Sequence, residues 1–257
     1  MREYSLSLLA WAYNEEQLIE AFIRKSVQDL KKVSGDFEIV VVDDGSKDRT
    51  WEKLQALAKE FPCLKPVRHE RNRDVGEATQ SAIAHATKEI LFWNTIDMFF
   101  DTADLPKFLP HMENYDVLQG VRTDLKANAP LRKLTSIVNY FLNRWLFGVK
   151  LSEFQNVKFF KRDFGRSVEF ESASVFTNPE LIIKAYYQGL RIKEVPMEFH
   201  ERTAGKQKGA KWSTLSKTLR DILKCWFRWR VLGKIKMAER PGTIDSLHYK
   251  IWLPSRW

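Results

Sequence analysis

The sequence is poor in cysteine and has no long apolar run. Cys63 and Cys225 are too few and too far apart for a disulfide framework, and they show no zinc-ligand spacing. We therefore expect a reducing compartment, with the cytoplasm as the default. No stretch reaches the roughly 18 apolar residues that cross a bilayer, and the N-terminus lacks the pattern of a secretory signal. These absences predict a chain that does not span a membrane.

Acidic residues are scarce in one region only. The chain has 42 basic and 33 acidic residues, giving a net charge of +9, and 12 of the basic residues lie between Arg202 and Arg240. That segment holds only two acidic residues, Asp221 and Glu239. Such a local excess calls for an anionic partner. Nucleic acid is a weak choice, because no recognised nucleic-acid motif is present.

Strand-like and helix-like segments alternate through the first half of the chain. Apolar spacing and turn residues predict strands at Ser5–Ala12, Asp36–Val42, Leu64–Arg68 and Glu89–Trp93. Helices are predicted between them, from residues 14–16 onward, from a cap near Ser46 to Phe61, and at Gly76–Thr87. Short loops in strand–helix alternation indicate an α/β fold with a mostly parallel, Rossmann-like central sheet flanked by helices.

The second half is less regular. It predicts a strand at Asp116–Val121, a helix at Leu131–Leu146 and a strand at Arg191–Phe199, where Pro196 indicates a sheet edge or a bulge. No linker-like stretch separates the two halves. We therefore expect one domain, residues 1–212, and a basic, aromatic extension, residues 213–257.

Two adjacent carboxylates follow the most apolar of the predicted strands. Asp43 and Asp44 come directly after Ile39–Val42, and Gly45-Ser46 supplies a turn. Ligands of open α/β sheets bind beyond the carboxyl ends of the strands. Two carboxylates there are suited to the base and ribose of a nucleotide. The alternative is an ordinary turn with a helix cap.

Longer motifs around these carboxylates resemble a known family. Residues 12–16, Ala-Tyr-Asn-Glu-Glu, residues 42–46, Val-Asp-Asp-Gly-Ser, and residues 72–76, Asn-Arg-Asp-Val-Gly, are similar to the opening of family 2 glycosyltransferases, which have the GT-A fold. Residues 119–122, 132–136 and 193–196, with the later positions Phe199, Arg202, Gly205 and Lys208, resemble the branch that makes polyprenyl-phosphate sugars, such as dolichyl-phosphate mannose synthases. The resemblance covers roughly residues 5–215.

The resemblance implies a donor site for a nucleotide sugar, linked to uridine or guanosine diphosphate. The residues that would bind the donor are Ala12, Tyr13, Asn14, Glu15, Val42, Asp43, Asp44, Gly76, Thr95 and Ile96. In the family an Asp-x-Asp holds a divalent metal, which neutralises the leaving diphosphate. Here Asp97 matches the second aspartate and Thr95 replaces the first. Mg²⁺ or Mn²⁺ would then be held by Asp97, the diphosphate and water, or be replaced by basic side chains. The plain alternative is that Asp97 caps a loop.

The resemblance also implies an acceptor site for a polyprenyl phosphate. Arg122, Arg132 and Arg202 would bind the acceptor phosphate or the donor diphosphate, with Lys208 assisting. Asp97, Arg122, Arg132 and Glu153 are the expected catalytic residues, and inversion at the anomeric carbon is the family's outcome. Solvated surface charge is the alternative for the arginines.

Two other functions remain open at this point. A saccharide or other hydroxyl acceptor would need a base, for which Glu153, Glu171 and Asp97 are the candidates. A degenerate homologue would bind a nucleotide sugar without transferring it.

The extension is predicted to form an amphipathic helix at Ser213–Trp229. One side of the helical wheel holds Leu215, Leu219, Ile222, Leu223, Trp226 and Trp229, and the other holds Lys217, Arg220, Lys224 and Arg228. Such a helix can lie in the interface of an anionic membrane, which would make the protein peripheral at the cytoplasmic face. The same apolar stripe could instead dock on the catalytic domain.

Overall fold

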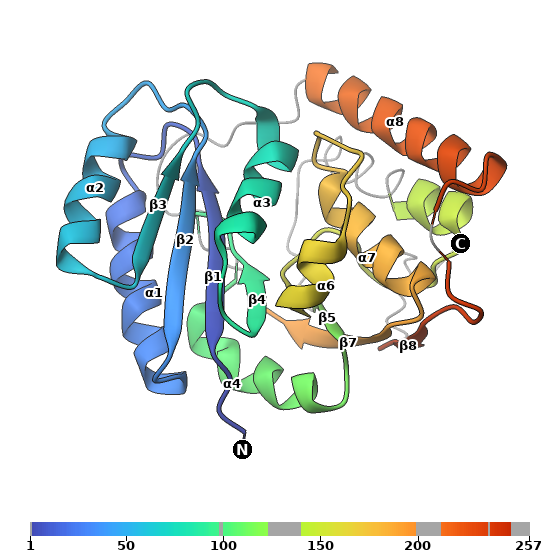
Figure 1. Ribbon diagram of the computed structural model, residues 1–257, viewed down its shortest axis with the longest axis horizontal. Coiled ribbons are helices and arrows are strands. Elements are labelled where there is room, and N and C mark those ends of the chain that lie inside the picture. Colours follow the sequence, from blue (N-terminus) through green and yellow to red (C-terminus); the bar gives the residue numbers. More distant parts are fainter. Residues whose placement is uncertain (1, 98–99, 123–139, 199–211, 236, 248–257) are drawn as a thin grey trace, which may run out of the picture.

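The computed structural model describes residues 2–97, 100–122, 140–198, 212–235 and 237–247. They form an eight-stranded sheet with the order β3-β2-β1-β4-β6-β5-β7-β8 (Figure 1). In chain order, the strands are β1 Leu6–Ala12, β2 Phe37–Asp43, β3 Leu64–Arg68, β4 Ile90–Trp93, β5 Val117–Arg122, β6 Lys158–Lys161, β7 Arg191–Met197 and β8 Thr243–Asp245. All pairs are parallel except those of β6 with β4 and β5. The predicted α/β fold is confirmed.

Helices cover both faces of the sheet because the strands are apolar on both sides. The helices are α1 Ile19–Val33, α2 Thr50–Glu60, α3 Asp74–His85, α4 Leu105–Phe108, α6 Arg162–Ser167, α7 Thr177–Tyr187 and α8 Trp212–Trp226. In β2, Ile39 and Val41 join the core beneath α1, α2 and α4, whereas Val40 and Val42 join the core beneath α3, α6 and α7. Burial on both faces is what the run of β-branched residues predicted.

Two helices begin later than their sequence signals indicate. The predicted cap near Ser46 is wrong: α2 begins at Thr50, whose N–H donates to Asp48 Oδ1 at 3.0 Å. Residues 14–16 do not open a helix, since α1 begins at Ile19. In both places polar residues before the helix bind the neighbouring loop: the Asn14 N–H donates to Ser46 Oγ, and the Glu16 N–H donates to Asp48 Oδ2.

The second half contains a strand that the sequence analysis missed. β6 is only four residues long and starts with a lysine, so its pattern gives no clear strand signal. Of the predicted helix at Leu131–Leu146, the described part is helical over 140–147. Pro196 of β7 pairs with Val121 of β5. The short strand β8 pairs with β7 only as far as Lys193, so the missing N–H of Pro196 loses no hydrogen bond to β8.

The C-terminal segment contributes to the same fold. Ile222 and Cys225 of α8, and Trp229 of the π-helical turn η3 (Phe227–Val231), are buried in the core beneath α7. β8 then joins the sheet beside β7. Within the described residues, no helix combines the length and the apolar character needed to cross a membrane.

Candidate active site

Three neighbouring parallel strands carry the predicted donor residues to one edge of the sheet. β1 ends at Ala12, β2 ends at Asp43, and β4 is followed by Thr95 and Asp97. Their order in the sheet is β2-β1-β4, so these carboxyl ends lie side by side at the top of Figure 1. The geometry is that of the ligand crevice of an open α/β sheet.

The loops after β1 and β2 are joined by hydrogen bonds between their motifs. The Asn14 N–H donates to Ser46 Oγ at 2.9 Å, and the Lys47 N–H donates to Asn14 Oδ1 at 2.8 Å. The Glu15 N–H donates to Thr50 Oγ1 at 2.9 Å. Asn14 has a positive φ of 54°, which asparagine tolerates better than most residues. The two motifs therefore fold as one unit, and Asn14 has a structural role within it.

Asp44 is buried and holds a third loop. Its Oδ1 accepts from the Arg73 N–H at 2.9 Å and lies 2.7 Å from His69 Nδ1. His69 Nε2 is 2.8 Å from Ser81 Oγ of α3. Asp44 thus fixes residues 69–73 against the end of β2, in addition to any contact with a nucleotide.

Asp43, at the end of β2, is also fully buried. Its Oδ1 accepts from the Ser46 N–H at 3.1 Å, while Oδ2 has no hydrogen bond and lies 3.5 Å from Arg68 Nε. The Arg68 guanidinium in turn lies over the Trp51 ring. Asp43 therefore keeps one acceptor oxygen that no described residue satisfies by a hydrogen bond.

Two glycines allow this edge to be closely packed. A Cβ on Gly45 would lie 2.6 Å from the Arg71 backbone, and its φ is +73°. A Cβ on Gly76 would lie 2.6 Å from the Ala173 backbone, and the Gly76 N–H donates to the Ala173 carbonyl at 3.0 Å. Only glycine fits either position without backbone movement.

The loop after β4 supplies one carboxylate and one hydroxyl. The Thr95 hydroxyl donates to Asp97 Oδ1, and both side chains are partly exposed. Ile96, between them, is buried. Among the described residues, no three His, Cys, Asp or Glu side chains are placed to hold a metal ion together. Since Mg²⁺ takes about six oxygen ligands, these residues fit a metal only if a donor diphosphate supplies further oxygens.

Of the four residues predicted to bind the acceptor phosphate, the structure describes Arg122, and it also describes the predicted catalytic residue Glu153. Arg122, at the end of β5, donates through Nε to Asn156 Oδ1 at 3.1 Å. Glu153 Oε1 accepts from the N–H groups of Phe154 and Gln155, at 3.0 and 3.1 Å. Glu153 thus folds back on its own turn. Arg132, Arg202 and Lys208 lie outside the described residues.

Glu171, a candidate base for a hydroxyl acceptor, is engaged in other contacts. Its carboxylate accepts from the Trp229 indole N–H at 2.7 Å and pairs with Arg228 at 2.6 Å. Burial alone would raise the pKa of Glu171, but the Trp229 hydrogen bond and the charges of Lys184 and Arg228 lower it. A carboxylate with a lowered pKa is poorly suited to deprotonate a hydroxyl. Glu171 instead fastens η3 to the domain.

Two residues that organise the site were missed. His69 and Asn156 position Asp44 and Arg122, respectively, and both are buried. His69 follows directly after β3, so its place at a strand end was the available signal. Asn156 had no comparable signal, because β6, the strand that begins two residues after it, was not predicted from the sequence.

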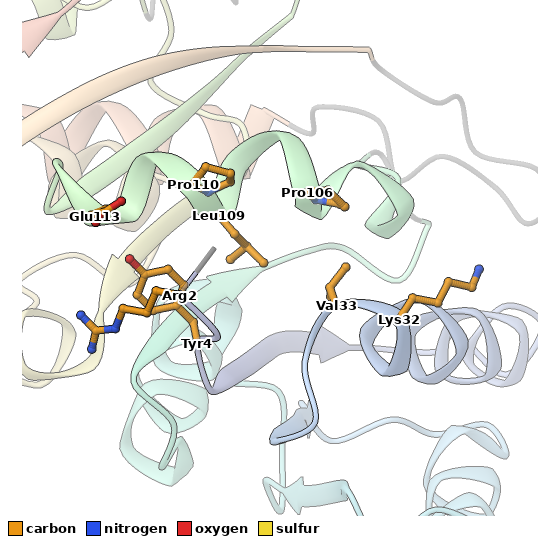
Figure 2. Close-up of a pocket in the computed structure, with 8 residues that line it drawn as sticks. All are labelled: Arg2, Tyr4, Lys32, Val33, Pro106, Leu109, Pro110 and Glu113. Carbon is orange, nitrogen blue, oxygen red and sulfur yellow. The ribbon is translucent and has the colours of Figure 1, made fainter.

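A cavity of about 250 Å³ lies elsewhere on the molecule. Figure 2 shows it between the N-terminal segment, the end of α1 and the turns around α4. Its lining residues are Arg2, Tyr4, Lys32, Val33, Pro106, Leu109, Pro110 and Glu113. Tyr4 precedes β1, so this cavity lies at the amino ends of the strands, opposite the candidate site.

Comparisons with known proteins agree with this geometry. The chain is 28% identical to dolichyl-phosphate beta-glucosyltransferase ALG5A of Trichomonas vaginalis, over 91% of this chain and 76% of that protein. It is 28% identical to dolichol-phosphate mannosyltransferase of Pyrococcus furiosus, over 84% of this chain and 62% of that protein. The chain therefore spans less than two thirds of the Pyrococcus relative.

A solved structure shows the same fold. Glucosyl-3-phosphoglycerate synthase from Mycobacterium tuberculosis, crystallised with Mn²⁺, uridine-diphosphate-glucose and phosphoglyceric acid, superposes with a TM-score of 0.66 at 17% identity, over 87% of this chain and 80% of that one. Residues 7–167, more than half of the chain, match the family described as Glycosyl transferase family 2. The chain belongs to that family and is a glycosyltransferase with the GT-A fold.

Proposed function

We propose that the protein transfers a sugar from a nucleotide sugar to a polyprenyl phosphate, with inversion, at the cytoplasmic face of a membrane. The observation that carries this proposal is the position of Arg122, held by Asn156 at the end of β5, on the same edge of the sheet as Asp44 and Asp97. The names of the two dolichyl-phosphate relatives support a phosphate acceptor.

The reaction depends more on placing charged groups around the phosphates than on transferring a proton. An acceptor phosphate oxygen attacks the anomeric carbon, and the bond from that carbon to the diphosphate breaks in the same displacement, which inverts the centre. The attacking oxygen is already anionic, so no base is required. Arg122 would orient the acceptor phosphate, with Arg132, Arg202 and Lys208 as further candidates, while Asp44 would hold the nucleoside.

Asp97 would hold Mg²⁺ or Mn²⁺ together with the donor diphosphate. A bound divalent cation would neutralise charge that develops on the leaving diphosphate. The Thr95 hydroxyl fixes the Asp97 carboxylate through its hydrogen bond.

A hydroxyl acceptor is the weaker alternative. Of the candidate bases, Glu171 is bound to η3, and one carboxylate oxygen of Glu153 accepts hydrogen bonds from two backbone amides. Asp97, the third candidate base, is assigned to the metal in this proposal.

The proposal includes peripheral binding to an anionic membrane through α8 and η3. One row, Thr218, Ile222, Cys225 and Trp229, is buried against the domain. A second row at four-residue spacing, Leu219, Leu223, Phe227 and Val231, is 45–53% exposed. The predicted apolar stripe therefore divides into a docked row and an exposed row.

The basic side of the same helix is partly engaged. Lys217 pairs with Asp74 at 2.8 Å and Arg228 with Glu171 at 2.6 Å, so neither is fully available to lipid headgroups. Aromatic exposure continues on the neighbouring helical residues 140–147, where Trp145 is 82% exposed.

Vesicle binding tests the membrane contact. Leu223→Ser with Phe227→Ser should reduce binding to vesicles containing phosphatidylserine by at least about tenfold, because two large apolar side chains are lost from the interface. Met237→Ser, an exposed methionine outside the row, is the matched control. Equal binding by both variants contradicts the membrane contact. Deleting 213–257 would be a poorer test, because it removes Ile222, Cys225 and Trp229 from the core.

A transfer assay tests the reaction. The full chain is incubated with a short polyprenyl phosphate and a panel of uridine- and guanosine-diphosphate sugars, with Mg²⁺, Mn²⁺ or chelator, and mass spectrometry detects the glycolipid. A glycolipid from one donor supports the proposal. Donor binding without any product overturns it in favour of another acceptor or a non-catalytic homologue.

A further inference from the structure

The protein buries a lysine beneath the turn that carries Glu153 and Asn156. Lys158, the first residue of β6, is fully buried, and its Nζ forms no ion pair with any described carboxylate. It lies 5.4 Å from the centre of the Trp93 ring. Burial lowers the pKa of Lys158, while the Glu153 charge acts in the opposite direction. Burying a lysine without an ion pair is energetically unfavourable, so the hydrogen bonds that compensate for its burial are of interest.

Those contacts are backbone carbonyls of one turn. Lys158 Nζ donates to the Phe154 carbonyl at 2.8 Å, to the Asn156 carbonyl at 3.3 Å, and to Asn178 Oδ1. Asn178 Nδ2 donates to the Gln155 carbonyl. The carbonyls of residues 154, 155 and 156 are therefore all held by Lys158 and Asn178, which we call the carbonyl clamp.

The clamp connects directly to the acceptor side of the site. Glu153 caps the amides of the same turn, and Asn156 Oδ1 accepts from Arg122 Nε. A neutral apolar residue at position 158 would leave the carbonyls of Phe154 and Asn156 without this donor. The turn would then relax, and Asn156 would no longer hold Arg122 in one position.

We propose that Lys158 is a positioning residue that sets the orientation of Arg122 and Glu153 by holding the carbonyls of residues 154–156. The role of Lys158 in sugar transfer to the acceptor rests on the proposed function. Its hydrogen bonds to the turn at residues 154–156 do not depend on that function. Lys158 touches no substrate in this scheme and acts through Asn156.

The test compares Lys158→Met with Lys161→Met, a lysine of the same strand whose Nζ pairs with Asp116 at 2.9 Å outside the turn. Hydrogen exchange, measured without substrate, should be at least about tenfold faster for the Phe154 and Gln155 amides in the Lys158 variant only. Its kcat/KM for transfer to polyprenyl phosphate should fall about 100-fold, as expected for a misplaced orienting group. Its Kd for the donor nucleotide should stay within about threefold.

Asn178→Ala is the second variant, in case Lys158→Met does not fold. It removes the other half of the clamp and should show the same pattern with a smaller effect. Unchanged exchange at Phe154 and Gln155 overturns the proposal, as does an equal loss of donor affinity and transfer. If the wild-type protein transfers no sugar to polyprenyl phosphate, the proposed function fails, while hydrogen exchange still decides whether Lys158 holds the turn.

Discussion

The proposed donor side and the proposed acceptor side of the site are held together in different ways. On the donor side, the loops after β1 and β2 bind one another through partly exposed amides and small polar side chains, such as Asn14 with Ser46. On the acceptor side, buried ionisable side chains hold the loops through hydrogen bonds. Lys158 binds the turn at 154–156, and the fully buried Glu194 accepts from Ser152 Oγ at 2.8 Å and Ser246 Oγ at 2.7 Å.

This difference determines which substitutions harm which side. The donor loops depend on close backbone packing and on the buried Asp44, so they should be sensitive both to added side-chain atoms and to loss of that carboxylate. The acceptor loops depend on the hydrogen bonds of Lys158 and Glu194, so they should be sensitive to the loss of either polar side chain. The following substitutions separate the two cases.

Asp44→Ala should give the largest effect on donor binding. It removes the acceptor for His69 and for the Arg73 amide, as well as the proposed nucleoside contact. We expect the Kd for the donor nucleotide to rise at least about 100-fold, measured by calorimetry. Glu70→Ala, an exposed carboxylate in the same loop, is the control. Unchanged affinity in Asp44→Ala would remove the nucleotide assignment.

Gly45→Ala should destabilise the donor side. The new Cβ meets the Arg71 backbone at 2.6 Å and requires a positive φ, so we expect a loss of about 2 to 4 kcal/mol in the free energy of unfolding. Gly148 also has a positive φ but open space around it. Gly148→Ala should therefore lose only about 1 kcal/mol. Similar losses in urea unfolding would show that close packing at Gly45 is unimportant.

Thr95→Asp should strengthen metal binding. It restores a second carboxylate beside Asp97, and ligand charge controls the affinity for hard cations. We expect half-maximal activity at roughly tenfold lower Mg²⁺ concentration. Thr95→Asn, which adds no charge, is the control. An unchanged Mg²⁺ requirement would mean that this loop does not hold the metal.

Acid should lower the free energy of unfolding by protonating Glu38, a carboxylate that lies outside the candidate site. Burial would raise the pKa of Glu38, but hydrogen bonds from Lys65, Ser7 and Thr87 lower it to about 2. Because the folded pKa lies below the ordinary 4.5, its contribution is complete above that pH and is lost as the pH falls toward about 2. In urea unfolding, Glu38→Gln should have a lower free energy of unfolding than wild type near neutral pH. Between pH 4.5 and about 2, that free energy should fall less in Glu38→Gln than in wild type. An acid dependence equal to that of wild type would contradict this role.

Sequence reasoning placed the carboxylates of the proposed donor side correctly because their signals are local. A buried-type strand followed by Asp43 and Asp44 predicts two carboxylates at the carboxyl edge of a sheet, and the structure has both carboxylates at that edge. The acceptor side was less accessible, because β6 is short and antiparallel and begins with a buried lysine. No periodic pattern marks Lys158 as buried, and the contact between Arg122 and Asn156 depends on how β6 lies beside β5.

Arg122→Ala tests the separation of the two sides most directly. Its donor Kd and its rate of transfer to polyprenyl phosphate are measured on the same preparation. We predict a donor Kd within about threefold of wild type and a transfer rate at least about 100-fold lower, because a charged group that orients the acceptor is lost. A loss of donor affinity as large as that of Asp44→Ala would place Arg122 on the donor side and contradict the division.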